Sequence, residues 1–372
     1  MVTARDVARR AGVSTSTVSH VLNGTRGVSK ELRSRVLAAS EELAFEPSTI
    51  ARSLKTNHSE MIGLIVPGVN PYFMDVLLGV EQVAERRGYS VIFCHSHEDA
   101  ARERAYLRLL RGRRVDGIVL VPNLGPSEEI DRLIRIGCPL VLVDRGIPGR
   151  SIDLVTVDNE PAAYLGTRHL LDQGHTRIAM VTGDPAVYSS EPRVRGYRRA
   201  MAEAGLEFDD ELVECGFGRT REGHEATLRL LSHRNHPTAL MAGNDLMSIG
   251  ALAAIQELGL RVPEDLAYVG FDELEWAGLV KPPLTTVAQP VAEIGRTAAE
   301  LLLNRIEGDS AGSARRVALS ATLMVRGSSL SQGPRASSSP VLLPNDPPAR
   351  DRARTTGAKS AKAGVAARAE AG

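Results

Sequence analysis

Residues 13–24 read VSTSTVSHVLNG, and this stretch decides how the first part of the chain folds. Four hydroxyl residues (14–17) come first, and apolar residues follow at helical spacing, at Val18, Val21 and Leu22. A hydroxyl residue before an apolar period is a good helix N-cap, because its oxygen accepts a backbone N–H that has no partner inside the helix. The stretch therefore predicts a helix with hydroxyl groups on its first turn and an apolar face toward a core.

The neighbouring residues extend this helix into a small three-helix unit. Ser14 is interpreted as the N-cap, and the helix is expected over about 15–22. An earlier helix begins at residues 5–10, and Gly12 stands where a chain stops and turns sharply. A third helix is expected over about 30–44. Helix, glycine turn and helix in this order are typical of a helix-turn-helix.

The second helix of a helix-turn-helix carries the residues that contact DNA. Its N-terminal turn enters the major groove, where short side chains approach base edges and phosphates. Thr15, Ser16 and His20 lie opposite the apolar stripe and have no role in the core, so we interpret them, with Thr17, as DNA-contacting residues. Arg26, in the loop before the third helix, is placed to meet the backbone or a groove. The alternative for His20 is an exposed histidine without a DNA contact.

The segment after Pro47 is expected to be a hinge that becomes helical only on DNA. Residues 47–59 (PSTIARSLKTNHS) contain too few helix-competent residues to hold a helix alone in water. Leu54 is an apolar side chain in this polar and basic stretch. It either packs against a neighbouring domain or inserts between base steps from the minor groove, with Arg52 and Lys55 on phosphates.

The length and the charge of the chain limit the classes of function that are possible. At 372 residues and 43% hydrophobic, the chain supports two or three cores. Residues 1–59 carry nine Lys or Arg against five Asp or Glu, and residues 331–372 seven against three, although the whole chain is neutral. A basic first segment favours an anionic partner, or is only a solvated surface. No apolar run approaches the roughly 20 residues of a membrane span, so we expect a cytoplasmic protein without a signal peptide or membrane contact.

The sequence gives little support for disulfides, metal sites or nucleotide and hydrolase chemistry. Cys94, Cys138 and Cys215 lie far apart without CxxC spacing, which disfavours a disulfide framework or a zinc ribbon. His95 and His97 are interpreted as structural or surface histidines rather than metal ligands. No glycine-rich nucleotide motif or GxSxG follows a strand. We therefore expect no cofactor, no metal and no enzyme activity.

From residue 61 the chain alternates β-branched runs with amphipathic helices, which predicts an α/β fold with doubly wound parallel sheets. The pattern repeats, so two lobes are expected, with crossovers at 156–163 and 285–292. The expected divisions are a headpiece (1–46), a hinge (47–59), a core (60–330) and a disordered tail (331–372). Within the core, the first lobe is expected at about 60–159 plus 290–330, with a strand at 315–325, and the second lobe at about 160–289.

Ligands of such sheets bind outside the carboxyl ends of the strands. Polar residues gather at these ends: Asn70, Asp144, Arg145, Asp158, Asn159, Asn244, Asp245, Asp272 and Glu273, with the aromatic Tyr72 and Phe73 and with Gln289 in a crossover. Carboxylate, amide and guanidinium groups that face an aromatic ring suit a polyol, whose hydroxyls both donate and accept. The alternatives are an N-cap for Asp245 and Asp158 and a core position for Tyr72.

The head and the core both resemble one family. DVARRAGVSTSTVSHVLNGTRGVS (6–29) and FEPSTIARSLK (45–55) resemble the headpiece and hinge helix of the LacI/GalR (lactose-repressor) family. GNDLMSIGALAAIQELGLRVPEDLAYVGFD (243–272) and PPLTTVAQP (282–290) resemble its effector-binding core, which is related to periplasmic sugar-binding proteins. The resemblance covers about residues 3–330. Within the family, the head is most similar to the purine repressor branch.

The resemblance implies roles for individual residues. It implies that Thr15, Ser16, His20 and Arg26 read the major groove and that Leu54 with Lys55 contacts the minor groove. It places seven residues where the family holds its effector: Phe73, Arg145, Arg193, Phe217, Asn244, Asp272 and Gln289. Tyr72, beside Phe73, joins them as a ring that could stack on a sugar or on a planar base.

Together these features predict a ligand-responsive transcriptional regulator, most simply a repressor, that binds a palindromic operator as a homodimer. The tail lacks the leucine heptads of a tetramer. We expect a small sugar effector, because Arg145 stands where the purine repressor branch has a tryptophan, and a guanidinium pairs with vicinal oxygens. The alternatives are a purine or nucleoside effector, a stand-alone cytoplasmic sugar-binding module, and an enzyme.

Overall fold

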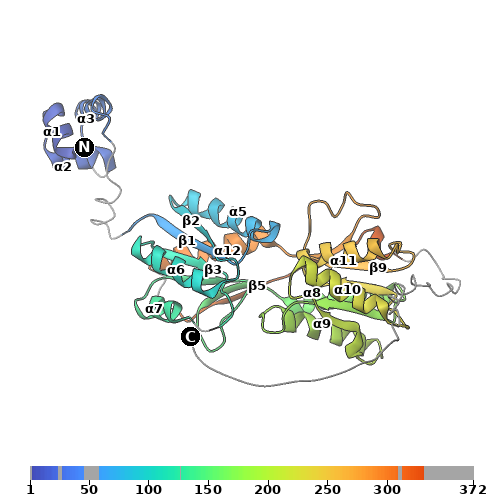
Figure 1. The fold of residues 1–372 in the computed structure, drawn as a ribbon. Coiled ribbons are helices and arrows are strands. Elements are labelled where there is room, and N and C mark those ends of the chain that lie inside the picture. Colours follow the sequence, from blue (N-terminus) through green and yellow to red (C-terminus); the bar gives the residue numbers. More distant parts are fainter. Residues whose placement is uncertain (1, 24–26, 46–57, 126, 309–311, 331–372) are drawn as a thin grey trace, which may run out of the picture. The chain divides into compact units, whose positions relative to one another are not determined.

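The computed structural model describes residues 2–23, 27–45, 58–125, 127–308 and 312–330 (Figure 1). Most of the predicted hinge and the whole predicted tail lie outside the described residues. The outcome for those two segments therefore stays a prediction.

The first described segments form the expected helix-turn-helix. Its helices are α1 (Ala4–Ala11), α2 (Thr15–Asn23) and α3 (Lys30–Glu42). Gly12 ends α1 in the left-handed region with φ 63°, which costs glycine little because it has no Cβ. The three helices share a core to which α1 gives Val7, α2 gives Val18 and Val21, and α3 gives Val36.

The first lobe is built on a six-stranded sheet in the order β11-β5-β4-β3-β1-β2, and all neighbouring strands are parallel. Its strands are β1 (Met61–Val66), β2 (Ser90–His95), β3 (Gly117–Leu120), β4 (Leu140–Val143), β5 (Asp153–Val157) and β11 (Arg316–Leu319). Its helices are α5 (Pro71–Arg86), α6 (Ala100–Gly112), α7 (Glu128–Arg135) and α12 (Val291–Ile306). Successive residues of β3 point to opposite faces of the sheet. Val119 packs with α5 and α12, and Ile118 packs with α6 and α7. The sheet is therefore covered by helices on both sides.

The second lobe repeats this plan with the strand order β12-β10-β9-β8-β6-β7. Its strands are β6 (Ile178–Thr182), β7 (Val213–Cys215), β8 (Ala239–Ala242), β9 (Ala267–Phe271), β10 (Thr285–Ala288) and β12 (Thr322–Met324). Its helices are α8 (Asn159–Asp172), α9 (Ser190–Glu203), α10 (Thr220–Ser232) and α11 (Asp245–Glu257), with short 3-10 turns at Asp210–Leu212 and Gly327–Ser329. Leu240 packs with α10 and α11, and Met241 packs with α8 and α9. The α/β fold with two doubly wound lobes is thus confirmed.

The chain passes three times between the two sheets. The passages from β5 to α8 and from β10 to α12 are the two crossovers predicted at 156–163 and 285–292. The third passage corrects a prediction. The single strand expected at 315–325 is two strands, because β11 joins the first sheet whereas β12 pairs antiparallel with β10 in the second. Residues 322–324 therefore belong to the second lobe and not to the first.

Glycines bring α5 close to α12. A Cβ on Gly79 would lie 2.2 Å from the carbonyl oxygen of Ala292, and a Cβ on Gly295 would lie 2.3 Å from that of Val76. Larger side chains at either glycine would push the helices apart. Within the part of the chain described here, no helix is long and apolar enough to cross a membrane.

Candidate functional site

The α2 helix shows the expected division between a capped start, a packed face and an exposed face. Ser14 caps it, because its hydroxyl accepts the backbone N–H of Thr17 at 3.1 Å. Val18 and Val21 are buried in the core of the head. Thr15, Ser16 and His20 are exposed. The side chains predicted to contact DNA therefore lie on one accessible helix.

Thr17 differs from its neighbours on α2. It is half-buried, and its hydroxyl lies 2.8 Å from that of Ser14. Its side chain thus takes part in the capping network at the start of the helix, as does that of the exposed Ser16, whose hydroxyl lies 2.7 Å from that of Ser14. Three other predicted DNA contacts, Arg26, Leu54 and Lys55, lie outside the described residues.

A cavity of about 680 Å³ lies between the two lobes, at the carboxyl ends of their strands. It is lined by all eight residues predicted to bind an effector: Tyr72, Phe73, Arg145, Arg193, Phe217, Asn244, Asp272 and Gln289. Tyr72 and Phe73 lie in the first turn of α5, with ring centroids 5.2 Å apart and planes nearly perpendicular. The volume is within the range of sites for small molecules.

Asparagines cap two of the helices that begin at the cavity, one from each lobe. The Asn70 side chain accepts the N–H of Phe73 at the start of α5, and the Asn244 side chain accepts that of Met247 at the start of α11. The amide of Asn244 also donates to the carbonyl of Gly218 at 3.2 Å. The interpretation of Asp245 as an N-cap is wrong, because Asn244 is the cap and Asp245 is the first residue of the helix.

Two buried carboxylates lie side by side on the second lobe. Asp272 follows β9 with φ 73°, and it accepts the backbone N–H of Asp245 at 3.1 Å and the amide N–H of Gln289. Burial is the largest cause that raises the pKa of both carboxyls. The charge of Asp272 adds to it at Asp245, whose pKa rises to about 6. This end of the cavity resists further negative charge.

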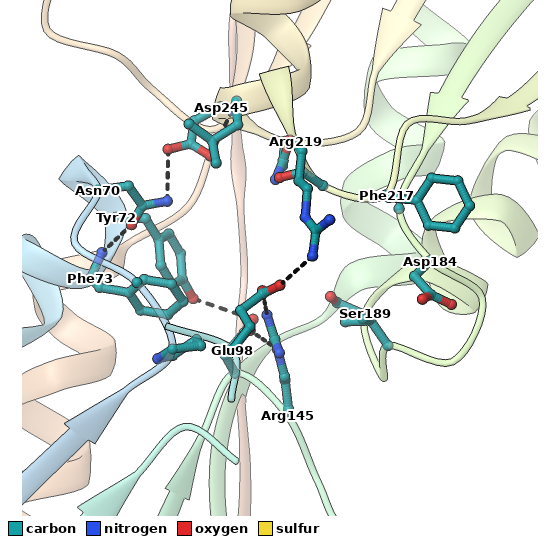
Figure 2. A pocket seen from close by; sticks show the side chains of 18 of the residues that line it. Asn70, Tyr72, Phe73, Glu98, Arg145, Asp184, Ser189, Phe217, Arg219 and Asp245 are labelled. Atoms are coloured by element: carbon teal, nitrogen blue, oxygen red, sulfur yellow. Dashed lines mark hydrogen bonds and ion pairs between the residues drawn. The ribbon is translucent and has the colours of Figure 1, made fainter. Parts of the chain in front are cut away.

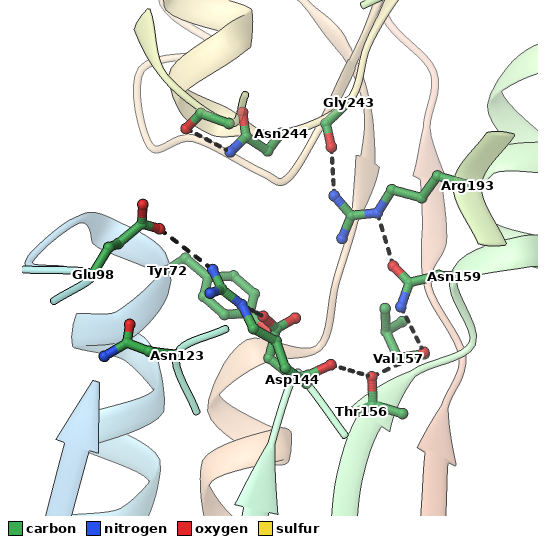
Figure 3. Close-up of polar contacts among 12 residues, drawn as sticks. Tyr72, Glu98, Asn123, Asp144, Thr156, Val157, Asn159, Arg193, Gly243 and Asn244 are labelled. Atoms are coloured by element: carbon green, nitrogen blue, oxygen red, sulfur yellow. Dashed lines mark hydrogen bonds and ion pairs between the residues drawn. The ribbon is translucent and has the colours of Figure 1, made fainter. Parts of the chain in front are cut away.

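Arg193 is held from three sides, although Pro192 precedes it near the start of α9. Its Nε donates to Asn159 at 2.8 Å and one terminal nitrogen donates to the carbonyl of Gly243, as Figure 3 shows. The guanidinium also lies 3.8 Å from the centroid of the Phe271 ring. This fixed position presents the cation to the cavity at low entropic cost.

Two amide oxygens in the cavity wall are buried and have no hydrogen-bond partner among the described residues: Asn123 Oδ1 and Gln289 Oε1. The hydrogen bond that each amide nitrogen donates fixes which end of the amide is the oxygen. The Asn123 amide nitrogen donates to the Ser96 hydroxyl at 2.9 Å, and that hydroxyl donates onward to the carbonyl of Val66. The Gln289 nitrogen donates to the carboxylate of Asp272. Both oxygens are therefore buried hydrogen-bond acceptors in the wall of the cavity.

An ionic bridge spans the cavity. Figure 2 shows the carboxylate of Glu98 between two guanidinium groups, that of Arg145 in the first lobe and that of Arg219 in the second. The nitrogen to oxygen distances are 3.6 Å to Arg145 and 3.5 Å to Arg219. Arg145 also lies 3.4 Å from Asp144. Phe217, near Arg219, is 51% exposed, and its ring points away from Glu98.

Several lining residues were not predicted from the sequence, notably Glu98, Asn123 and Arg219. They follow the carboxyl ends of β2, β3 and β7, and this position is the sequence signal that marks them, because ligands of such sheets bind at these ends. The rule did select Asp158, Asn159 and Glu273, and these three residues are not among the lining residues.

Two histidines that line the cavity, His95 and His97, have rings that contact each other with their planes tilted by 43°. The rings of His95 and His97 have centroids 3.6 Å apart. In the described segments, no group of three or more His, Cys, Asp or Glu side chains is arranged to hold a metal ion.

Two family models match the chain. Residues 3–48 match the model of the bacterial regulatory proteins of the lacI family. Residues 167–329 match that of the periplasmic binding protein-like domain.

Curated relatives cover most of the chain. The HTH-type transcriptional repressor PurR of Aliivibrio fischeri (strain MJ11) is 40% identical over 312 residues, which is 82% of this chain and 92% of that protein. The PurR of Serratia proteamaculans (strain 568) is 40% identical over 309 residues, 82% of this chain and 91% of that protein.

Solved structures agree with this assignment. A lac repressor dimer bound to operator and the anti-inducer ONPF superposes with a TM-score of 0.79, at 27% identity, over 89% of this chain and 99% of that chain. A complex of the transcriptional regulator CelR with cellobiose gives a TM-score of 0.68, at 32% identity, over 88% of this chain and all of that chain. The chain belongs to the lacI family of bacterial regulatory proteins, and it is a regulatory protein rather than an enzyme.

Proposed function

We propose that this chain is a transcriptional repressor that binds a palindromic operator as a homodimer and responds to a small sugar in the interlobe cavity. The observation that carries DNA binding is the exposed group of Thr15, Ser16 and His20 on the capped α2 helix. The relatives named above are repressors, and the superposed lac repressor is a dimer on its operator. Cytoplasmic location follows from this function.

The head would read DNA with the first turns of α2. Short hydroxyls of Thr15 and Ser16 reach base edges and phosphates, and the His20 ring reaches further into the major groove. Val18 and Val21 hold the helix on the head while it lies in the groove. Thr17, Arg26, Leu54 and Lys55 complete the proposed contacts, the last two from the minor groove.

The observation that favours a sugar is the pair of unpartnered acceptors, Asn123 Oδ1 and Gln289 Oε1. A sugar carries several hydroxyls, each of which donates to such an oxygen and accepts from a guanidinium. Asp272 and Arg193 add a fixed acceptor and a fixed donor, and the Phe73 ring offers a face for C–H groups. Leaving a buried acceptor unpaired costs about 1–3 kcal/mol, so ligands without donors bind poorly.

The effector would act by changing how the two lobes meet. Asn70 donates to Asp245 across the cavity at 3.0 Å, and Glu98 bridges to Arg219. A ligand shifts DNA affinity only by as much as its affinities for two lobe arrangements differ. A sugar that contacts both lobes meets this requirement.

The test uses the full chain. A binding-site selection from random duplexes defines the operator, and fluorescence anisotropy measures its affinity with and without each member of a sugar panel. Sedimentation of the protein with operator gives the stoichiometry. Selection of a palindrome, two chains per site and a changed affinity with a sugar support the proposal. No enriched sequence contradicts operator binding, and a silent panel contradicts the sugar.

A purine effector is the second candidate. The perpendicular Tyr72 and Phe73 rings could stack a planar base as well as a sugar face. Two of the relatives reported above carry the name PurR. Calorimetry with hypoxanthine and guanine beside the sugar panel separates the two. Binding of a purine with every sugar silent favours this candidate.

A further inference from the structure

We propose that the cavity contains a subsite for an anionic group of the effector, formed by Arg145 and Arg219 and occupied in this structure by the side chain of Glu98. The effector is then an acidic small molecule, a sugar that carries a carboxylate or a phosphate. This inference rests on the proposed effector function, whose ligand class it narrows.

The first support is the geometry of the bridge. Arg145 follows β4 in the first lobe, and Arg219 is the N-cap of α10 in the second. Both point a guanidinium nitrogen at the same carboxylate, at 3.6 and 3.5 Å (Figure 2). Two guanidinium groups that converge on one carboxylate form the arrangement by which proteins hold carboxylates and phosphates.

The second support is that the interaction of Glu98 with the two arginines is weak. Charge-assisted hydrogen bonds are about 2.7–2.9 Å long, and both contacts exceed that length. The Glu98 side chain is 48% exposed and that of Arg219 is 60% exposed. An ion pair between such exposed side chains contributes little to stability, so a ligand anion can displace Glu98 at small cost.

The third support lies in the backbone around Glu98. His97 and Glu98 are consecutive non-glycine residues in the left-handed region, with φ 57° and 56°. Such residues are uncommon and cost free energy. The N–H of Glu98 donates to the carbonyl of Pro67 at 2.9 Å, which fixes the loop while the side chain extends toward the arginines. Release of the side chain leaves that backbone hydrogen bond intact.

Among the other charges of the cavity, Asp144 lies 3.4 Å from the Nε of Arg145, which leaves the terminal nitrogen of Arg145 that faces Glu98. Asp245 and Asp272 bind donors of their own, and Arg193 is occupied by Asn159 and Gly243. The α9 and α10 helices also begin at the cavity without a hydrogen bond from their N-cap side chains, Ser189 and Arg219. The positive ends of these two helices add to the field at the bridge.

The test measures binding of two simple anions to the full chain, at constant ionic strength against chloride. Inorganic phosphate and acetate are titrated by calorimetry into the wild type and into Glu98→Gln, which removes the internal anion. We expect at least a fivefold tighter Kd for one of the anions. A gain for phosphate assigns a phosphate group to the effector, and a gain for acetate assigns a carboxylate. The double variant Glu98→Gln with Arg219→Gln should lose the gain.

Glu293→Gln is the matched control, because Glu293 is also 48% exposed and ion-paired, with Arg296 on α12, and does not line the cavity. Its anion affinities should stay within twofold of the wild type. Glu98→Ala serves as a second variant if the glutamine form does not fold. Equal affinities in the wild type and the Glu98 variant that folds, or a gain that persists without Arg219, would overturn the subsite. The experiment contains no DNA and no sugar, so its failure leaves the proposed repressor function standing.

Discussion

Asn70 of the first lobe donates a hydrogen bond to Asp245 of the second, with 3.0 Å between its amide nitrogen and the carboxylate oxygen. The oxygen of the same amide caps α5 through the N–H of Phe73. The second oxygen of Asp245 accepts the N–H of Leu246 at the start of α11. One side chain thus ties the starts of two helices from different lobes.

Asn70→Ser should separate these two roles. Serine is also a good N-cap, so the free energy of unfolding should fall by less than about 1 kcal/mol. Its shorter hydroxyl does not span the distance to Asp245, so the lobes open more often. Hydrogen exchange of the backbone amides at Leu246 and Met247 should become faster. Asp99→Ser, which changes the cap of α6 within the first lobe, is the control. Equal exchange in the two variants would show that the bond across the cavity does not hold the lobes.

The buried Asp245 predicts a pH dependence of stability. Its folded pKa of about 6 lies above the ordinary value of 3.8, so the folded state binds the proton more tightly than the unfolded state. The contribution of Asp245 to stability is therefore fully present below about pH 4, is lost as the pH rises from about 4 to 6, and then stays level. The raised pKa of Asp272 acts in the same direction.

Asp245→Asn should remove the contribution of Asp245 to this loss of stability with rising pH. The free energy of unfolding of the wild type falls between pH 4 and 7, and this fall should be smaller by about 2 kcal/mol in the variant. One pKa unit corresponds to about 1.4 kcal/mol, and the titration of Asp245 is coupled to that of Asp272. Urea unfolding at several pH values measures it. Asp131→Asn, at a half-buried carboxyl whose pKa is lowered by Arg150, should change the pH dependence of stability with the opposite sign. An unchanged profile in Asp245→Asn would mean that Asp245 titrates normally.

Local sequence was enough to predict most of the fold. Apolar spacing and the Ser14 cap placed α2 within one residue, and the alternation of strands and helices gave both lobes. The strand expected at 315–325 failed for a physical reason. A continuous strand and two short strands have the same residue pattern. Which of the two forms depends on the free sheet edges at β5 and β10, with which β11 and β12 pair. Residues far away in the sequence create these edges.

The site was predicted to the extent that it lies where strands end. All eight effector-binding candidates line one cavity, including Arg193 despite the proline before it. The bridge of Glu98 to Arg219 was not foreseen, because their partnership exists only after two separately folded lobes meet. The free acceptor of Asn123 likewise depends on Ser96 from another loop.

Asp272→Ala should abolish the ligand response and leave DNA binding intact. Asp272 accepts from Gln289 and from the N–H of Asp245, so its loss leaves donors unpaired in a closed cavity at about 1–3 kcal/mol each. Ligand affinity should fall at least tenfold by calorimetry, and operator affinity without ligand should stay within twofold. Glu273→Ala, at a neighbour that does not line the cavity, should keep the response. A normal response in Asp272→Ala would exclude Asp272 from the binding site.

His20→Ala should change which base the operator prefers at one symmetric position of each half-site. The ring is exposed on α2, opposite Val18 and Val21, so its removal does not disturb the core of the head. A base-edge contact carries about 1–3 kcal/mol of discrimination, so the preference at that position should weaken about tenfold or more. Binding-site selection with the full chain measures this, with Glu41→Ala, an exposed change on α3, as the control. The control should return the wild-type consensus. If His20→Ala returns it as well, His20 contacts no base, and sequence reading by α2 falls to Thr15 and Ser16.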